Sequence, residues 1–219
     1  MATVNDVLNI ARGEIGYSAY DDPEQGSKYG RWLANKWGQA WLAGPSTSNW
    51  WCCMYVSWVL DQAGQPCVGF PSYNTDLVLS DRPPRVNAKD ARPGDIIIWN
   101  WDGDGATDHI GIVEHHEPGA YGTLITIEGN YRNSVARVDR SGTWSLVSAV
   151  IRPQYDGEEA DMTDQQSKML EAVYRALCVP QDASGRGVES PMADRLAWMA
   201  AKQEKMQADV TAIREATAK

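Results

Sequence analysis

The feature that most constrains the fold of this chain is a change of hydrophobic period near residue 92. Before it, apolar residues recur every three or four positions, as in helices; after it, short apolar runs alternate with turns rich in Gly, Asp and Pro. Helical segments followed by a series of strands are typical of an α+β domain, in which helices pack on an antiparallel sheet. We therefore predict an α+β fold with about five antiparallel strands.

Start and stop signals place the individual segments. A capping-box pattern, Thr3-x-x-Asp6, opens the first helix, which should end near Gly16. The other predicted helices span 28–42, 50–64 and 74–79, and the predicted strands span 96–99, 109–114, 124–128, 134–138 and 147–152. Short turns join these strands, which predicts a meandering sheet.

The segment 50–64 holds two adjacent cysteines, Cys52 and Cys53, near its start. The residues just before it are turn-forming, and Asn49 is the expected N-cap of the helix. Cys52 then lies in the first helical turn, where unpaired N–H groups and the helix dipole favour a thiolate. Such a cysteine is a candidate nucleophile, although taken alone it fits a buried packing residue better.

A cysteine nucleophile needs a base, and the sequence has three histidines. His115 and His116 precede a Glu-Pro-Gly turn and are expected to be solvated. His109 opens a strand directly after an acidic turn, so its imidazole can face a cleft while the strand packs behind it. Glu128 ends the next strand and Asn130 follows it, and either could accept the imidazole N–H and fix its tautomer.

Four motifs stand in the chain in this order: Trp51-Cys52-x-x-Tyr55-Val56-Ser57-Trp58, Arg92-Pro93-Gly94-Asp95-Ile96-Ile97, Asp108-His109-Ile110-Gly111-Ile112-Val113 and Ile127-Glu128-Gly129-Asn130. Over roughly residues 5–155 the chain resembles the CHAP domain, the cysteine, histidine-dependent amidohydrolase/peptidase family that belongs with the papain-like NlpC/P60 peptidases. The resemblance implies that Cys52 is the nucleophile and His109 the base. It further implies that Glu128 is the orienting carboxylate, with Asn130 in support.

One position departs from the family pattern. The residue after the nucleophile is usually small, and here it is Cys53. On a helix it points about 100° away from Cys52, and so we expect it to face the packed side.

The CHAP family cleaves peptidoglycan, either at the N-acetylmuramoyl-L-alanine amide or within the stem or cross-bridge peptide. The resemblance therefore implies a peptidoglycan hydrolase that works by acyl transfer to a thiolate. The chain has ten tryptophans against one phenylalanine, and Trp is favoured where a flat apolar face must also offer a polar edge. Trp50, Trp51 and Trp99 are the candidate walls of a substrate groove, with core packing expected for at least one of them.

No cofactor is expected. Asp102-x-Asp104-Gly105-x-x-Asp108 partly imitates the start of a calcium loop but lacks the terminal bidentate Glu. Asp102, Asp104 and Asp108 are therefore weak calcium candidates, and a tight hairpin turn explains them as well. The four cysteines show neither a disulfide framework nor a zinc-ligand spacing, so reduced thiols are expected.

A polar acidic linker follows Pro153 and predicts a catalytic domain over 1–155 and a helical tail over 156–219. From about Pro191, apolar residues alternate steps of four and three, which is the a/d pattern of a coiled coil. We expect a homo-oligomer formed through 190–217; the alternative is a single amphipathic helix that folds back on the domain. The tail would either multimerise the enzyme or recognise the wall.

The formal net charge of −9 argues against a nucleic-acid partner. No apolar run of about 18 residues occurs, so no membrane insertion is expected, and the first residues lack the pattern of a signal peptide. We therefore expect synthesis in a host cytoplasm and action on bacterial peptidoglycan in the cell wall, as by a bacteriophage endolysin. The alternatives are a phage tail-associated structural protein with a lytic domain, a bacterial autolysin, an intracellular papain-like protease and an inactive wall-binding module.

Overall fold

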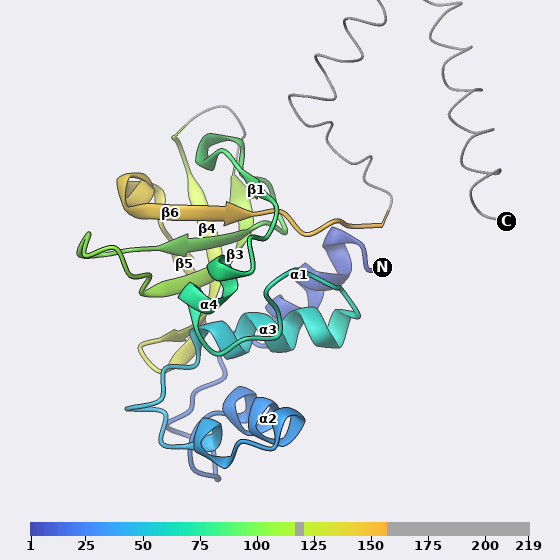
Figure 1. Ribbon diagram of the computed structural model, residues 1–219, viewed down its shortest axis with the longest axis vertical. Helices are drawn as coiled ribbons and strands as arrows, with labels where there is room; N and C mark the ends of the chain where they lie inside the picture. Colours follow the sequence, from blue (N-terminus) through green and yellow to red (C-terminus); the bar gives the residue numbers. More distant parts are fainter. Residues whose placement is uncertain (117–120, 157–219) are drawn as a thin grey trace, which may run out of the picture. The chain divides into compact units, whose positions relative to one another are not determined.

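The computed structural model describes residues 1–116 and 121–156 and confirms the α+β class (Figure 1). The helices are α1 (Val4–Gly13), α2 (Lys28–Trp37), α3 (Cys52–Ala63) and α4 (Thr75–Ser80), with short 3-10 turns at Ala40–Ala43, Ala88–Asp90 and Ser141–Leu146. The strands are β1 (Arg85–Val86), β2 (Ile96–Trp99), β3 (His109–His116), β4 (Leu124–Tyr131), β5 (Ser134–Asp139) and β6 (Val147–Ile151).

Within the described residues these strands form one antiparallel sheet in the order β1-β6-β2-β3-β4-β5. Strands β2 to β5 are the predicted meander, and β6 returns to lie between β1 and β2. The sheet has six strands rather than about five because β1, only two residues long, was not predicted. Two residues are too few for an alternating pattern to be visible in the sequence.

Helix α1 starts as predicted but ends at Gly13 rather than near Gly16, and the expected N-cap of α3 is wrong. In α1 the Asp6 backbone N–H donates to Thr3 Oγ1 and the Thr3 backbone N–H donates to Asp6 Oδ2, which is the predicted capping box. Asn49, however, is not the N-cap of α3, because Trp51 holds that place. The Asn49 amide instead donates to the carbonyl oxygens of Trp41 and Leu42, at 3.0 and 2.8 Å, and so closes the preceding loop.

Helices α1 and α3 pack on one face of the sheet, which presents Ile96, Ile98, Ile110, Ile112 and Ile127, and α2 packs against α3. A smaller cluster, with Ile97, Trp99, Val113, Leu124 and Val150, covers the other face. Helix α3 lies directly against the sheet (Figure 1). A Cβ atom on Gly129 of β4 would lie 2.4 Å from the Cβ of Tyr55 in α3, and so the close approach requires glycine there.

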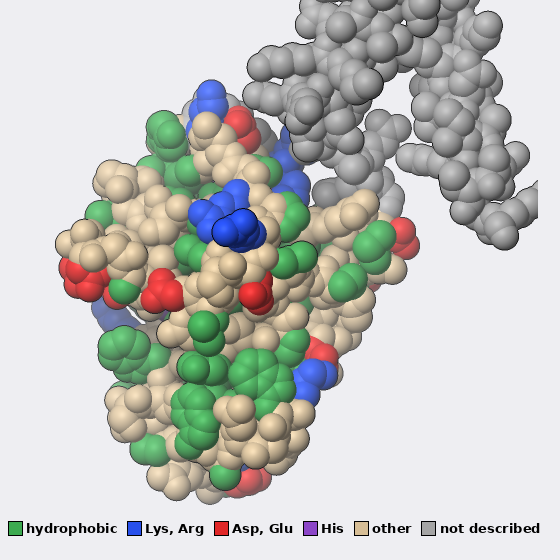
Figure 2. All heavy atoms as spheres, viewed as in Figure 1, with side chains coloured by type: hydrophobic (Ala, Val, Ile, Leu, Met, Phe, Trp, Pro, Cys, Tyr) green, Lys and Arg blue, Asp and Glu red, His purple; other side chains and the backbone are tan. Residues whose placement is uncertain are grey.

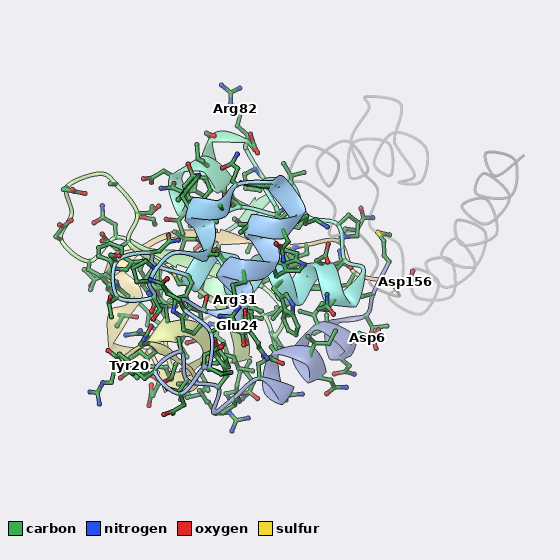
Figure 3. The ribbon with its side chains drawn as sticks, turned by 90° about the horizontal axis from the view of Figure 1, so that it is seen from below. Asp6, Tyr20, Glu24, Arg31, Arg82 and Asp156 are labelled. Atoms are coloured by element: carbon green, nitrogen blue, oxygen red, sulfur yellow. The ribbon has the colours of Figure 1, made fainter. Side chains whose placement is uncertain are left out.

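The two ends of the described domain meet. The Asp156 backbone N–H donates to the carbonyl of Ala2 at 2.9 Å, and Asp156 and Asp6 lie on the same side of the molecule in Figure 3. The chain divides into two units, residues 1–160 and 161–219. The predicted linker and tail of 156–219, with the coiled-coil segment 190–217, lie outside the described residues except for Asp156. No helix in the described ranges is long and apolar enough to cross a membrane.

Candidate active site

Three of the predicted site residues meet where α3, β3 and β4 converge. Cys52 is the first residue of α3, His109 is the first residue of β3, and Glu128 lies within β4. The Cys52 thiol is near enough to the His109 imidazole to raise its pKa, and His109 Nε2 lies 2.8 Å from Glu128 Oε2. Because Glu128 occupies Nε2, Nδ1 is the ring nitrogen left for the thiol. The three side chains thus lie in the order that a nucleophile, a base and an orienting carboxylate would require.

Strand register explains how Glu128 reaches the histidine. Ile112 of β3 pairs with Ile127 of β4, which places Glu128 beside Gly111, two residues beyond His109. A Cβ atom on Gly111 would lie 2.8 Å from Glu128 Cγ. The glycine therefore leaves the space through which the glutamate side chain extends towards the imidazole.

Glu128 is completely buried, and four hydrogen bonds surround its carboxylate. Oε1 accepts from Arg140 Nε at 2.8 Å and from the Thr126 hydroxyl at 2.6 Å. Oε2 lies 2.6 Å from Arg140 Nη2 and 2.8 Å from His109 Nε2. Burial alone would raise the Glu128 pKa, but the bonds from Arg140 and His109 outweigh it and hold that pKa at about 2. Sequence reasoning missed both Thr126 and Arg140.

His109 is also buried, with Trp99 stacked on it and Trp101 tilted against it. Its ring lies 5.9 Å from Trp99 and 6.2 Å from Trp101, with interplanar angles of 28° and 33°. Burial opposes the charged imidazolium, but the hydrogen bonds to Cys52 and Glu128 outweigh that effect and raise the His109 pKa to about 9. The imidazolium is therefore the form favoured at neutral pH.

The first turn of α3 begins beside the thiol, and its first backbone N–H groups have no partner within the helix. The N-cap residue, Trp51, supplies no side-chain cap for them, and N–H groups at a helix start suit an anion. Cys53 is completely buried and hydrogen-bonds with Ser57 and Ser72, and burial raises the pKa of its thiol. Cys53 thus faces the packed side, as expected.

Comparison with known proteins agrees with this geometry. A family model described as the CHAP domain matches residues 44–130, a range that holds Cys52, His109, Glu128 and Asn130. The chain is therefore similar to CHAP domains over this stretch. No curated protein sequence matches the chain.

Solved structures also match the chain, including the following two. One is an NlpC/P60 family protein from Bacillus cereus, with 14% identity and a TM-score of 0.44, and the match covers 69% of this chain and 40% of that one. The other is Ly7917, with 16% identity and a TM-score of 0.37, and the match covers 69% of this chain and 62% of that one. The chain therefore spans less than two thirds of either solved structure.

Asn130 has a backbone conformation that accounts for its position. Its φ is +60°, in the left-handed region that Asn tolerates better than most residues. It lies where the pairing of β4 with β5 shifts register, between Glu128 and Tyr131. Among the described residues its side chain makes no hydrogen bond, and its role in supporting the histidine stays a prediction.

Two of the three tryptophans predicted as groove walls are packing residues. Trp51 is 1% exposed, stacks on Tyr29 and donates from Nε1 to Asn133 Oδ1 at 3.0 Å. Trp99 is completely buried, so it presents no ring face to a substrate either. Trp50, at 67% exposure, is the one of the three that remains available.

Further aromatic rings are exposed elsewhere on the domain. Figure 2 shows hydrophobic side chains gathered on the face that carries α2 and α4. In this region Trp37 and Trp41 are 37% and 54% exposed, and both meet the ring of Tyr73 edge-on. Sequence periodicity placed the segment in an aromatic helix but could not separate buried rings from exposed ones.

The two histidines that end β3 differ from each other. His115 is exposed, as expected. His116 is buried, which corrects the prediction of a solvated turn residue. Its Nδ1 and Nε2 lie 2.9 and 3.3 Å from the carbonyl oxygens of Thr123 and Lys89, and its ring packs on Trp144. These contacts hold the strand end and are unconnected with the Cys52 thiol.

The weak calcium candidates are engaged in turns. Asp102, Asp104 and Asp108 accept backbone N–H groups of Asp104, Ala106 and Trp101, respectively. In the N-terminal acidic loop, Asp22 and Glu24 form ion pairs with Arg31 of α2 (Figure 3). Within residues 1–116 and 121–156 no three His, Cys, Asp or Glu side chains come together as metal ligands.

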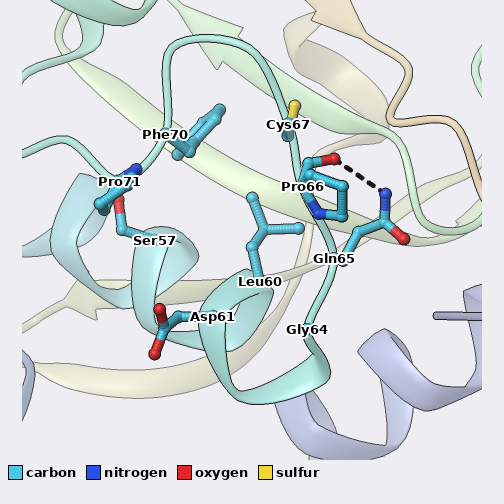
Figure 4. Close-up of a pocket in the computed structure, with 9 residues that line it drawn as sticks. All are labelled: Ser57, Leu60, Asp61, Gly64, Gln65, Pro66, Cys67, Phe70 and Pro71. Carbon is cyan, nitrogen blue, oxygen red and sulfur yellow. Dashed lines mark hydrogen bonds between the residues drawn. The ribbon is translucent and has the colours of Figure 1, made fainter. Parts of the chain in front are cut away.

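A pocket lies at the far end of α3 and is shown in Figure 4. Leu60, Asp61, Cys67 and Phe70 are among the residues that line it. The Gln65 side chain at its rim donates to the carbonyl oxygen of Pro66. No predicted catalytic residue lines this pocket, so it is separate from the Cys52 centre.

Proposed function

We propose that this CHAP-like domain hydrolyses an amide bond of bacterial peptidoglycan by cysteine nucleophilic catalysis. The observation that carries the proposal is the juxtaposition of Cys52, His109 and Glu128, in which His109 hydrogen-bonds with Glu128 and Cys52 begins a helix that has no side-chain cap. The CHAP match over 44–130 supports peptidoglycan as the substrate class.

The geometry supports a two-step acyl transfer. The Cys52 thiolate attacks the scissile carbonyl, and the resulting oxyanion is met by backbone N–H groups in the first turn of α3. His109 donates its Nδ1 proton to the departing amine, leaving a thioester on Cys52. His109, now neutral, takes a proton from water, which hydrolyses the thioester. Glu128 holds the imidazole through both steps. The protons and electrons of both steps balance without a metal or redox cofactor.

The deciding experiment uses two neighbouring thiols as test and control. The full chain, Cys52→Ala and Cys53→Ala are incubated with purified sacculi, and the released fragments are identified by mass spectrometry. We expect release by the wild type and by Cys53→Ala, and none by Cys52→Ala. Undiminished release by Cys52→Ala would overturn the mechanism. Digestion of casein but not of sacculi would instead indicate a general protease.

The same fragments identify the bond. A new N-terminal alanine together with intact lactyl sugars indicates an N-acetylmuramoyl-L-alanine amidase. A free terminus within the stem or cross-bridge indicates an endopeptidase. The biological role that we propose for this activity is that of a bacteriophage endolysin, which predicts lysis of whole susceptible cells by added protein.

For the tail we propose self-association through 190–217, based on the heptad pattern of the sequence. Association would raise the avidity of an acidic enzyme that gains no electrostatic attraction to an anionic wall. Sedimentation of the full chain and of a chain lacking residues 188–219 tests this. A monomer in both cases would end the coiled-coil proposal.

A further inference from the structure

Arg140 holds the carboxylate of Glu128 with a two-pronged hydrogen bond. It directly follows β5, and its Nε and Nη2 donate to the two oxygens of Glu128 at 2.8 and 2.6 Å. A guanidinium is rigid and planar, so two parallel bonds fix both the position and the plane of the carboxylate. The Oε2 oxygen that Arg140 binds is the one that faces His109 Nε2.

The guanidinium is itself held by aromatic rings. Its central carbon lies 4.9 Å from the ring of Trp101 and 5.4 Å from each of Trp99 and Tyr131. Trp99 and Trp101 also stack on each other, Trp99 stacks on His109, and Trp101 lies tilted beside it. The same pair of rings therefore positions the arginine and the imidazole, and the arginine side chain is only 17% exposed.

The other contacts of Glu128 cannot replace this constraint. The Thr126 hydroxyl binds Oε1 only, and the imidazole binds Oε2 only. Each of them leaves the carboxylate free to rotate about its own bond. Two polar groups face His109, the Cys52 thiol from α3 and the Glu128 carboxylate from β4. Rotation of the carboxylate would therefore change one of the two polar contacts of the imidazole.

We propose that Arg140 is a positioning residue for the hydrolytic reaction: its fork fixes Glu128 so that the imidazole stays aligned with the Cys52 thiol. The proposal rests on the proposed function for its role in turnover, but the geometric coupling of Arg140 to His109 exists without any substrate. Arg140 does not contact the reacting atoms and acts only through Glu128.

Arg140→Lys separates the fork from the charge. Lysine keeps a cation near Glu128 but cannot bind both oxygens in one plane. We expect kcat on sacculi to fall about 10²-fold, the scale of a misplacement of about 1 Å, with KM unchanged. The midpoint of the His109 titration, followed by NMR, should fall from its wild-type value towards about 6.5 because a loose carboxylate stabilises the imidazolium less. Arg140→Met should show at least as large a loss of kcat.

The matched control is Arg137→Met. Arg137 lies on β5 three residues earlier and pairs with Glu114 at the surface, where its side chain is 52% exposed. We expect it to keep both the kcat and the His109 midpoint of the wild type. Thermal unfolding shows which variants fold. If Arg140→Met does not fold, Arg140→Lys, which retains the charge, alone tests whether Arg140 positions Glu128.

Wild-type kcat and an unmoved His109 midpoint in Arg140→Lys would overturn the proposal, because charge alone would then suffice. If the wild type failed to hydrolyse sacculi, the proposed function would fail but this test would not. The His109 titration and the pH dependence of Cys52 alkylation by iodoacetamide would still report whether Arg140 positions the pair. An unchanged titration and alkylation profile in Arg140→Lys would then refute it.

Discussion

Gly129 is the position at which a single added carbon should separate the helix that carries Cys52 from the sheet that carries His109. In Gly129→Ala the new Cβ would lie 2.4 Å from Tyr55 Cβ and 2.6 Å from its Cγ, whereas carbon atoms pack best at about 3.5–4.0 Å. Tyr55 cannot turn away, because it is completely buried and its hydroxyl donates to the carbonyl of Ala11 at 3.1 Å. Helix α3 must therefore move by about 1 Å, the difference between the observed and the optimal separation.

This displacement has two measurable consequences. Overpacking of a core costs about 1–3 kcal/mol, and a cost of about 2 kcal/mol corresponds to a fall in Tm of roughly 4–8 °C for a domain of this size. Cys52 lies three residues before Tyr55 in α3 and moves with it, so hydrolysis should fall about 10²-fold. Gly13→Ala is the control, because a Cβ there meets nothing within 4 Å. Equal Tm and equal rates for Gly129→Ala and the wild type would refute the account of the helix–sheet contact.

Four further outcomes are expected. Gly111→Ala should lower the hydrolysis rate at least about 10-fold with a smaller loss of Tm than Gly129→Ala, because its closest contact is Glu128 Cγ at 2.8 Å and its other contacts are at an ordinary 3.5 Å; a rate equal to the wild type would contradict this. Protonated His109 stabilises the fold fully below pH 6.5, and this stability is lost as pH rises through about 9. The urea concentration at the unfolding midpoint should therefore fall between these pH values in the wild type and change less with pH in His109→Gln. Glu128→Gln should cost about 3–5 kcal/mol in urea unfolding, since it leaves the Arg140 cation without its buried partner; a cost below about 1 kcal/mol would show that the pair is solvated. Chelation with EGTA should leave hydrolysis unchanged, because the aspartates of 102–108 already bind backbone N–H groups, and restoration of lost activity by calcium would show otherwise.

The parts of the fold that were predictable from the sequence are those with local causes. The capping box that starts α1 and the glycine that ends α3 act within one helical turn, and both stand where they were expected. The placement of Cys52 at a helix start and of His109 at a strand start needed only the local period and the turn before each. The fold class then followed from the order of helices and strands.

Exposure was less predictable than secondary structure, because it depends on what packs against a residue from elsewhere in the chain. The sequence does not distinguish Trp51 and Trp99 from Trp50. In the structure, however, the indole N–H of Trp51 donates to Asn133 and that of Trp99 donates to Thr143, both of which lie far away in the sequence. His116 likewise receives its carbonyl partners from two other segments. A tryptophan or histidine therefore cannot be assigned to a groove or a core from its neighbours in the chain alone.

The contact of Arg140 with Glu128 shows how one unpredicted backbone feature decides a site. The turn after β4 pairs Tyr131 with Ser134, and an unbroken register from that pair would set Glu128 opposite Arg137. The register shift at Asn130 instead pairs Glu128 with Ala136, and the Arg140 N–H then bonds to the carbonyl of Leu124. Side chains alternate along a strand, so this slip of one residue moves Arg140 onto the face of Glu128. The sequence predicts the strands 124–128 and 134–138 but not the register in which they pair, and so it could not place the arginine beside the carboxylate that it binds.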